Sequence, residues 1–574
     1  MQVARGTPAS EGYAIARARV IRARERLEAP QDCRASEGED GKLERALSEY
    51  LKLVGDLAER APQADRELFE TYALMAQAIV EEARGLVWGG MCAEGAIAKV
   101  YEKYAGSLLS SSSELIRLRE QDLRDIASSL IALASGSQRR GAEDVRGAAV
   151  IAEELSPADF MRLADLGMAG LATSLGGITS HVAILARARG IPYVIAPGIH
   201  ERATDGALVI IDGFDGKVLL EPDEAALARY RELSSAYEAV KGLLRSYAHR
   251  PARTLDGVDV EVLCNVGNIE DARVASGAGC DGVGLFRVEF MYMGERPPSE
   301  EALREAFERV AGLFGGRPVV VRAPDLGADK PMPYFKFAEP NPFLGLRGIR
   351  LLLAQRDMLL RPFLRAVLGA RAKFENVKVM IPMVSRTSEV AEFLDELQRV
   401  AEHVGLPDLA GRVELGLMIE TPAAALMVDR LAKVEGVKFV SFGTNDLAQY
   451  VLAADRANPA VQAIYDDMDP SVLRLIRLAS ERARASGLRV EACGELAGRP
   501  LAVPLLIAMG ITSLSVNPRY VGVVKYVASN VSATRARDAV EDALRAAGPE
   551  EVRARARAFA QSFEGLRPAL PWLG

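Results

Sequence analysis

The stretch VELGLMIETPAAALMVDRLAKVEGVKFVSFGTND, residues 413–446, contains the unit from which the second half of the chain is built. Two apolar runs, 413–421 and 437–446, indicate buried strands, and a helical stretch separates them. A strand, a crossover helix and a second strand are typical of a parallel sheet. Comparable apolar runs occur at 258–266, 282–290, 317–325, 377–384, 488–495 and 513–518.

Repetition of this unit predicts the fold class of the second half. Eight strands with helical stretches between them, over about 300 residues, are typical of a TIM (β/α)8 barrel. We therefore expect a barrel domain at 251–574. The same apolar runs are also compatible with an open doubly wound sheet, but the count of eight favours the closed barrel.

The first half predicts a mixed α/β domain interrupted by a helical insert. Residues 1–24 alternate as short strands, and apolar runs at 148–154, 207–213 and 217–222 indicate further strands. Between them, apolar residues recur at spacings of three and four from residue 41 to about residue 137, which predicts a helical bundle. The expected divisions are a mixed domain at 1–24 and 141–222, a helical subdomain at 25–140 and a helical linker at 223–250.

Within the mixed domain, the stretch GGITSHVAILARARGIP, residues 176–192, predicts a short helix. Thr179 or Ser180 can cap its start and Gly190 ends it, so His181 falls in the first turn. Free N–H groups and the helix dipole at that end suit a phosphoryl group, and the same field keeps the imidazole neutral and nucleophilic. A histidine that only packs in a capped helix fits the stretch equally well.

Composition narrows the possible partners and compartments. The 574 residues carry a net charge of −7 and no long basic block, which argues against nucleic acid and anionic membranes as partners. No apolar run approaches the roughly 18 residues that span a bilayer, and we expect no signal peptide. Four histidines are too few for a histidine-rich metal site. The five cysteines are scattered and odd in number, so we expect a reducing cytoplasm.

Charged and polar residues recur where the predicted barrel strands end, which is where barrel enzymes place their chemistry. These are Arg287, Glu289, Arg322, Asp325, Glu420, Asn445, Asp446, Arg456, Cys493 and Glu495. Any one of them could form a structural ion pair. Gathering so many charged groups at one rim costs free energy of folding unless a bound ligand matches their charges. Two carboxylates suit a magnesium ion shared with a phosphorylated substrate, and arginines suit phosphate and carboxylate groups.

The order and spacing of these motifs resemble enzyme I of the bacterial phosphotransferase system, the phosphoenolpyruvate–protein phosphotransferases. The matching segments are GGITSH (176–181), GLFRVEF (284–290), VVVRAPDLGADK (319–330), NPFLGLRGIR (341–350), MIETPAA (418–424), FGTNDLAQY (442–450), DRANP (455–459) and CGELAG (493–498). The resemblance implies a swivelling phosphohistidine domain, an inserted subdomain that docks the carrier, and a barrel that binds phosphoenolpyruvate and forms a homodimer.

The resemblance also implies a role for each matching residue. His181 is the nucleophile that becomes phosphorylated, and Cys493 protonates the enolate carbon. Phosphoenolpyruvate is bound by Arg287, Arg322, Asn445, Asp446 and Arg456, while Glu420 and Asp446 hold Mg²⁺. The phosphoryl group then passes to the histidine phosphocarrier protein HPr, as the first step of the sugar phosphotransferase system. A regulatory phosphotransferase of the nitrogen-type branch is the alternative.

Two alternatives share these motifs. Phosphoenolpyruvate synthase and pyruvate phosphate dikinase also need an ATP-grasp domain, and no segment before the helical region is long enough for one. A silent regulatory protein would be expected to lose His181 or the rim residues, and all are present. The chain departs from the family at Ile178 and at Tyr72, which stands where the docking helix often carries histidine.

Overall fold

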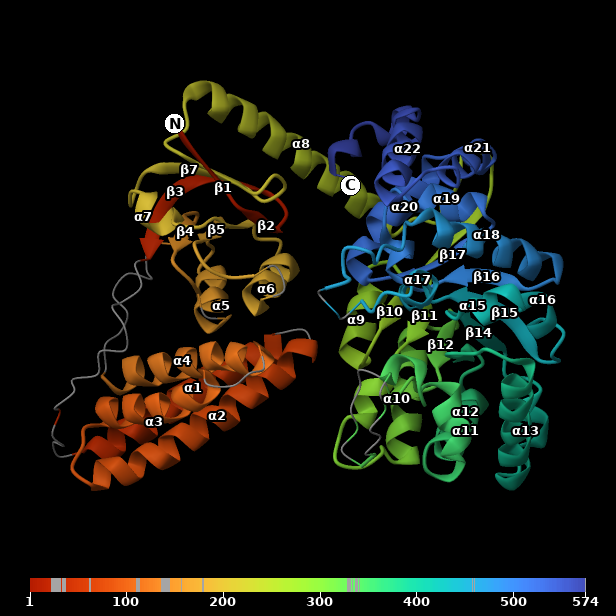
Figure 1. Cartoon of the computed structure of the whole chain (residues 1–574), viewed down its shortest axis with the longest axis horizontal. Helices are drawn as coiled ribbons and strands as arrows, with labels where there is room; N and C mark the ends of the chain where they lie inside the picture. Colours follow the sequence, from red (N-terminus) through yellow and green to blue (C-terminus); the bar gives the residue numbers. More distant parts are fainter. Residues whose placement is uncertain are drawn as a thin grey trace. The chain divides into compact units, whose positions relative to one another are not determined.

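The computed structural model describes residues 1–21, 33, 38–60, 63–109, 114–135, 145–155, 157–177, 180–327, 332, 334–335, 339, 341–456, 458 and 460–572. The chain forms two compact units, Met1–Glu238 and Ala239–Gly574 (Figure 1). The long helix α8 (Glu224–Ala248) contributes to both, as the predicted linker helix at 223–250 anticipates.

The N-terminal unit contains an eight-stranded sheet with the order β1-β8-β7-β3-β4-β5-β6-β2. Its strands are β1 (Gln2–Arg5), β2 (Thr7–Ser10), β3 (Tyr13–Ile21), β4 (Ala149–Ala152), β5 (Gly170–Thr173), β6 (Tyr193–Ile195), β7 (Leu208–Asp212) and β8 (Lys217–Leu220). Strands β3 and β4 are parallel neighbours, with Ala18 opposite Ala149, so the chain rejoins the sheet beside the strand from which the insert departed. The predicted strands are confirmed. Strands β5 and β6 were not predicted, because runs of four and three residues are too short to show a period.

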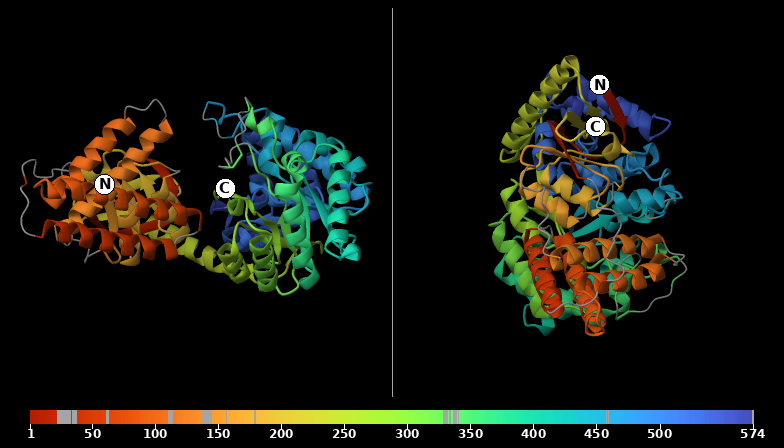
Figure 2. Two further views of the ribbon diagram at one scale, coloured as in Figure 1. Left: turned by 90° about the horizontal axis from the view of Figure 1, so that it is seen from below. Right: turned by 90° about the vertical axis from the view of Figure 1, so that its left-hand side faces the viewer.

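The insert is the predicted helical bundle. Its helices are α1 (Glu39–Arg60), α2 (Gln63–Trp88), α3 (Ala93–Leu109) and α4 (Glu114–Ala134), which lie side by side in Figures 1 and 2. Tyr72 is only 2% exposed and belongs to the apolar core of this unit. The departure from the family at Tyr72 is therefore a change in packing rather than in the bundle surface. Three shorter helices, α5 (Pro157–Asp165), α6 (His181–Arg189) and α7 (Ile199–Arg202), accompany the sheet.

The C-terminal unit is a closed barrel, so the TIM barrel is confirmed and the open sheet is wrong. Its eight parallel strands run in sequence order, and β10 pairs with both β11 and β17. They are β10 (Asp259–Val266), β11 (Val283–Phe286), β12 (Val319–Arg322), β13 (Val377–Ile381), β14 (Leu415–Ile419), β15 (Val437–Phe442), β16 (Arg489–Ala492) and β17 (Ser513–Val516). The short strand β9 (Ala252–Arg253) is antiparallel to β10.

Helices surround the barrel strands (Figure 2). They are α9 (Ile269–Gly277), α10 (Glu300–Leu313), α11 (Ile349–Ala354), α12 (Arg361–Lys373), α13 (Thr387–His403), α14 (Pro407–Ala410), α15 (Pro422–Leu426), α16 (Val428–Leu431), α17 (Thr444–Leu452), α18 (Pro470–Ala485), α19 (Val503–Ala508), α20 (Val521–Ser529), α21 (Ala533–Ala543) and α22 (Pro549–Gln561). Among the described residues, none of the helices has the length and apolar character needed to cross a membrane.

An apolar layer fills the middle of the barrel. It consists of Leu285, Val320, Met380, Met418 and Phe439, with Cys493 beside them. Gly416 makes room for the Phe439 ring, because a Cβ at Gly416 would lie 2.1 Å from that ring. The layer separates polar groups at the two ends of the barrel.

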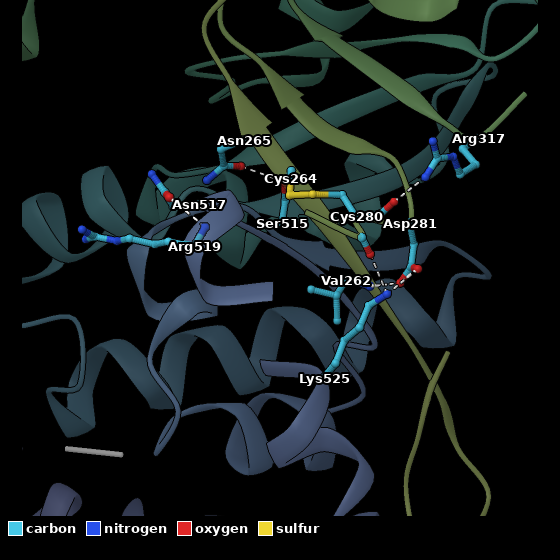
Figure 3. The surroundings of a disulfide bond; sticks show 11 residues. Val262, Cys264, Asn265, Cys280, Asp281, Arg317, Ser515, Asn517, Arg519 and Lys525 are labelled. Atoms are coloured by element: carbon cyan, nitrogen blue, oxygen red, sulfur yellow. Dashed lines mark hydrogen bonds and ion pairs between the residues drawn. A yellow bond between two sulfur atoms is a disulfide. The ribbon is translucent and has the colours of Figure 1, made fainter. Parts of the chain in front are cut away.

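The cysteines correct one expectation. The scattered, odd-numbered cysteines led us to expect a reducing cytoplasm, but Cys33 forms a disulfide with Cys92, and Cys264 forms one with Cys280. Figure 3 shows the second pair. Cys493 is the free cysteine. The pairs are 59 and 16 residues apart in sequence, so only the folded chain brings them together. The inference of a reducing compartment from cysteine spacing therefore loses its basis.

Candidate active site at the barrel rim

The carboxyl ends of the barrel strands gather the predicted site residues at one rim. Arg322 is the last residue of β12, and Glu420 directly follows β14. Asn445 and Asp446 lie in the first turn of α17 after β15, and Cys493 follows β16. Parallel strands end at the same edge, so residues as far apart in sequence as Arg322 and Cys493 contribute to one surface.

A chain of alternating charges connects these residues. The Arg322 Nη2 donates to Glu289 Oε1 at 2.6 Å, and its Nη1 lies 3.7 Å from Asp325 Oδ2. The Arg347 Nη2 donates to Asp325 Oδ2 at 2.7 Å, and its Nη1 donates to Asp446 Oδ1 at 3.1 Å. Burial by itself would lower the pKa of Arg322, but Glu289 and Asp325 raise it, so the guanidinium stays charged.

Arg347 was not predicted as a site residue. Its segment NPFLGLRGIR was recognised, but the residue lies in the loop before α11 rather than at a strand end. It is 2% exposed and bridges carboxylates from two strand ends. In the structure, Gly348 has φ +55°, and a Cβ there would lie 2.7 Å from the Met383 side chain, so only glycine fits. The sequence signal that could have pointed to Arg347 is therefore the glycine that directly follows it.

Two of the predicted carboxylates are suited to a cation. Glu420 is 1% exposed, and its Oε1 accepts a hydrogen bond from the Met383 N–H at 2.6 Å. Met383 holds this N–H in place with φ +58°, an uncommon conformation for a side chain of its size. Burial, then the charges of Asp446 and Asp325, raise the pKa of Glu420 well above its usual value. A bound cation would remove that penalty, and so the residues present fit a divalent metal.

Several donors at the rim are available to an anion. Among the described residues, the exposed Arg287 guanidinium has no partner, and the buried Nε of Arg322 makes no hydrogen bond. The Asn445 Oδ1 accepts from the Glu495 N–H at 2.9 Å, which leaves the Asn445 amide hydrogens to donate. The Arg456 guanidinium is 28% exposed and lies 3.8 Å from Asp446 Oδ2.

Cys493 lies beneath these donors, against the apolar layer. It is 2% exposed, and its thiol donates to the Phe442 carbonyl oxygen at 3.7 Å. Burial raises the pKa of the thiol to about 12, although the Ser441 hydroxyl lowers it slightly. The thiol is therefore protonated at neutral pH and has a proton to give. The Asn265 Nδ2 donates to the Cys493 carbonyl oxygen at 3.2 Å, and Figure 3 shows Asn265 also joined to Ser515.

His181 lies in the other unit, as the first residue of α6. Ser180 is the N-cap, since its side chain accepts from the Ala183 N–H at 3.3 Å. Gly190 ends the helix in the left-handed conformation with φ +64°. The predicted short helix and both of its boundaries are thus confirmed, while Thr179 and Ile178 lie outside the described residues.

No cluster of three or more His, Cys, Asp or Glu side chains among the described residues could hold a metal. A cation held by Glu420 and Asp446 would therefore need further oxygen ligands from a substrate or from water. That arrangement suits Mg²⁺, which keeps several waters and binds phosphorylated ligands through one or two carboxylates.

Comparison with known proteins places both units. Models of phosphoenolpyruvate-utilising enzymes match the chain over 5–119 (N-terminal), 145–216 (mobile domain) and 241–533 (phosphoenolpyruvate-binding domain). The phosphoenolpyruvate-protein phosphotransferase of Bacillus sp. (strain S) is 39% identical over 416 residues, covering 71% of this chain and 70% of the relative. That of Haloferax volcanii is 35% identical, covering 86% and 87%, and that of Listeria innocua 32% identical, covering 96% and 97%. The chain belongs to the family of phosphoenolpyruvate–protein phosphotransferases.

Proposed function

We propose that the protein phosphorylates His181 with phosphoenolpyruvate and then passes the phosphoryl group to HPr. The observation that carries the proposal is the rim itself. Arg287, the Arg322 Nε and the Asn445 amide are donors without partners among the described residues, and they lie at the same rim as a protonated thiol. A small, highly anionic substrate that needs a proton at carbon satisfies all of these groups at once.

The proposed first step is attack of a neutral His181 ring nitrogen on phosphorus, with cleavage of the P–O bond to the enolate. His181 is the first residue of α6, where the positive end of the helix dipole disfavours a charged imidazole and stabilises a negatively charged phosphoryl group. Mg²⁺ held by Glu420 and Asp446 would neutralise phosphoryl oxygens when bound. The rim arginines stabilise negative charge on the leaving enolate. The Cys493 S–H then gives its proton to the enolate carbon, which leaves pyruvate and a thiolate.

Transfer to a carrier requires the phosphohistidine to leave the rim. His181 and the rim residues belong to different compact units joined by α8. The attacking nitrogen must reach within about 3–3.5 Å of phosphorus in one step and meet HPr in the next. We therefore propose a swivelling domain at 1–24 and 141–222, a carrier-docking insert at 25–140, the linker at 223–250, and a barrel at 251–574 that also forms the homodimer. A cytoplasmic location belongs to the same proposal; it rests on the family and not on the cysteines, four of which are paired.

The test is incubation of the full chain with ³²P-labelled phosphoenolpyruvate and Mg²⁺, with and without purified HPr. Acid-labile label should map to the peptide that contains His181, and EDTA should abolish it. Glu420→Ala should abolish labelling from phosphoenolpyruvate but leave labelling by phosphorylated HPr intact, because that exchange uses the N-terminal unit. Label on a different residue, or equal loss of both reactions, would count against the proposal.

The silent regulatory alternative predicts binding of phosphoenolpyruvate without label. The phosphoenolpyruvate synthase alternative predicts that ATP, rather than HPr, is the second phosphoryl partner. Incubating the unphosphorylated enzyme with β-³²P-labelled ATP in place of phosphoenolpyruvate distinguishes them, because only a phosphoenolpyruvate synthase would take label from ATP onto its histidine. A sugar branch and a nitrogen-type branch differ in the HPr that accepts the label fastest.

A further inference from the structure

The N-terminal end of the barrel, on the far side of the apolar layer from the rim, contains a cavity of about 560 Å³. It opens where β10, β16 and β17 begin, and its apolar wall includes Pro251 and Leu488. Small-molecule sites are typically about 300–1,000 Å³ and combine apolar walls with a few polar groups. The size and the lining therefore fit a small ligand.

Glu491 is the most unusual group in this lining. Its side chain is 5% exposed, and it has no hydrogen bond or ion pair with any described residue. The basic groups around it, Arg489 and Lys378, both pair with Glu414, at 3.1 and 2.8 Å. A buried carboxyl without a partner is costly, and burial raises its pKa to about 7. Because the carboxyl borders the cavity, a ligand that donates hydrogen bonds can reach it.

The other carboxylates of the lining already have hydrogen-bond or ion-pair partners within the protein. Asp281 accepts from the Val262 N–H at 2.8 Å and from Lys525 Nζ at 2.7 Å, as Figure 3 shows. Asp259 forms an ion pair with Arg253 at 3.2 Å. Glu261 accepts only the Ser513 hydroxyl, at 3.2 Å. Glu261 is exposed, whereas Glu491 is the carboxyl of this lining that is both buried and without a partner among the described residues.

The same cavity has an unmatched cation. Arg484, at the end of α18, is exposed, lines the cavity and has no hydrogen bond or ion pair with any described residue. Its guanidinium lies on Gly510, where a Cβ would be 2.3 Å from Arg484 Nη1. Gly510 has φ +84°, so the backbone there also favours glycine. A side chain at position 510 would therefore displace the Arg484 guanidinium from its place beside the cavity.

We propose that this cavity binds a free amino acid, with its ammonium group at Glu491 and Glu261 and its carboxylate at Arg484. A simple amine would leave Arg484 unmatched, and a simple carboxylate would face two glutamates. A zwitterion satisfies both ends. The site is separate from the rim, so occupancy does not compete with phosphoenolpyruvate.

The experiment is a thermal-shift screen of the dialysed full chain against each standard L-amino acid at about 10 mM, followed by calorimetry on any that bind. At least one should raise the melting temperature, and the amine and the carboxylic acid that lack its carboxyl or amino group should bind about tenfold more weakly. Glu491→Gln should weaken binding by about tenfold or more, while labelling by phosphoenolpyruvate stays at the wild-type level. Saturating phosphoenolpyruvate with Mg²⁺ should leave the affinity unchanged.

Gly510→Ala is a second, independent variant, because it displaces Arg484 without touching a charge. This variant should weaken binding of the amino acid more than binding of the corresponding amine. The ligand-induced shift is compared within each variant, so a change in basal stability does not affect the conclusion. The proposal is overturned if no amino acid shifts the melting temperature, if Glu491→Gln binds as tightly as the wild type, or if phosphoenolpyruvate displaces the amino acid.

Discussion

Replacing Glu491 by glutamine should stabilise the C-terminal unit at neutral and alkaline pH. Burial raises the pKa of Glu491 from 4.5 to about 7. A raised folded-state pKa means that the carboxyl favours folding fully below pH 4.5, and that this contribution is lost as the pH rises through 7. At about 1.4 kcal/mol per pH unit, the penalty at pH 8 is on the order of 3 kcal/mol. Glutamine has nearly the same shape and carries no such penalty.

The measurement is urea unfolding from pH 4.5 to pH 8 in amino-acid-free buffer, with tryptophan fluorescence as the probe. The chain has two tryptophans, and Trp572 packs on the core of the C-terminal unit. Trp88, in the other unit, is 76% exposed, so replacing it should change stability little. Every sample therefore carries Trp88→Phe, which restricts the fluorescence signal to the C-terminal unit. This matters because a chain of two units need not unfold in one step.

Glu414→Gln is the matched control. Burial by itself would raise the pKa of Glu414. The hydrogen bond from Lys378, together with the positive charges of Lys378 and Arg489, outweighs that effect and lowers the pKa. Its replacement should therefore destabilise the barrel at neutral pH and matter less in acid, the opposite sign to Glu491→Gln. The free energy of unfolding of Glu491→Gln is compared with that of the parent protein at each pH. A difference that is independent of pH, or that grows toward acid, would refute the description of Glu491 as a buried, unpaired carboxyl.

Three further variants test the packing around the site. Arg347→Met removes the nearest arginine from two buried carboxylates, so it should cost about 3–5 kcal/mol in urea unfolding and abolish labelling from phosphoenolpyruvate. Gly416→Ala forces a methyl group against the Phe439 ring, and calorimetry should find the barrel destabilised by about 1–3 kcal/mol. Cys264→Ser with Cys280→Ser opens a loop of 16 residues and should cost about 3 kcal/mol without reductant. Dithiothreitol should destabilise the barrel of the wild type but not the barrel of this double variant, whose remaining disulfide, Cys33–Cys92, lies in the N-terminal unit.

Much of the architecture could be predicted from the sequence, because the signals involved are local. A buried parallel strand is a continuous apolar run, and counting such runs after residue 251 predicted the closed barrel. The helix that begins at His181 was predicted because its cap and its terminating glycine stand next to it in sequence. Elements of three or four residues, such as β5 and β6, carry too little pattern to be recognised.

The tertiary structure alone decided which groups meet. The Arg347–Asp446 pair joins residues 99 apart in sequence, and Glu491 lacks a partner because its basic neighbours turn to Glu414. Neither fact has a local signature, since charge pairing depends on which strand ends the barrel brings together. The disulfides and the cavity at the N-terminal end of the barrel depend on the same long-range closure. Propensity and capping act over a few residues, whereas burial and pairing are properties of the closed fold.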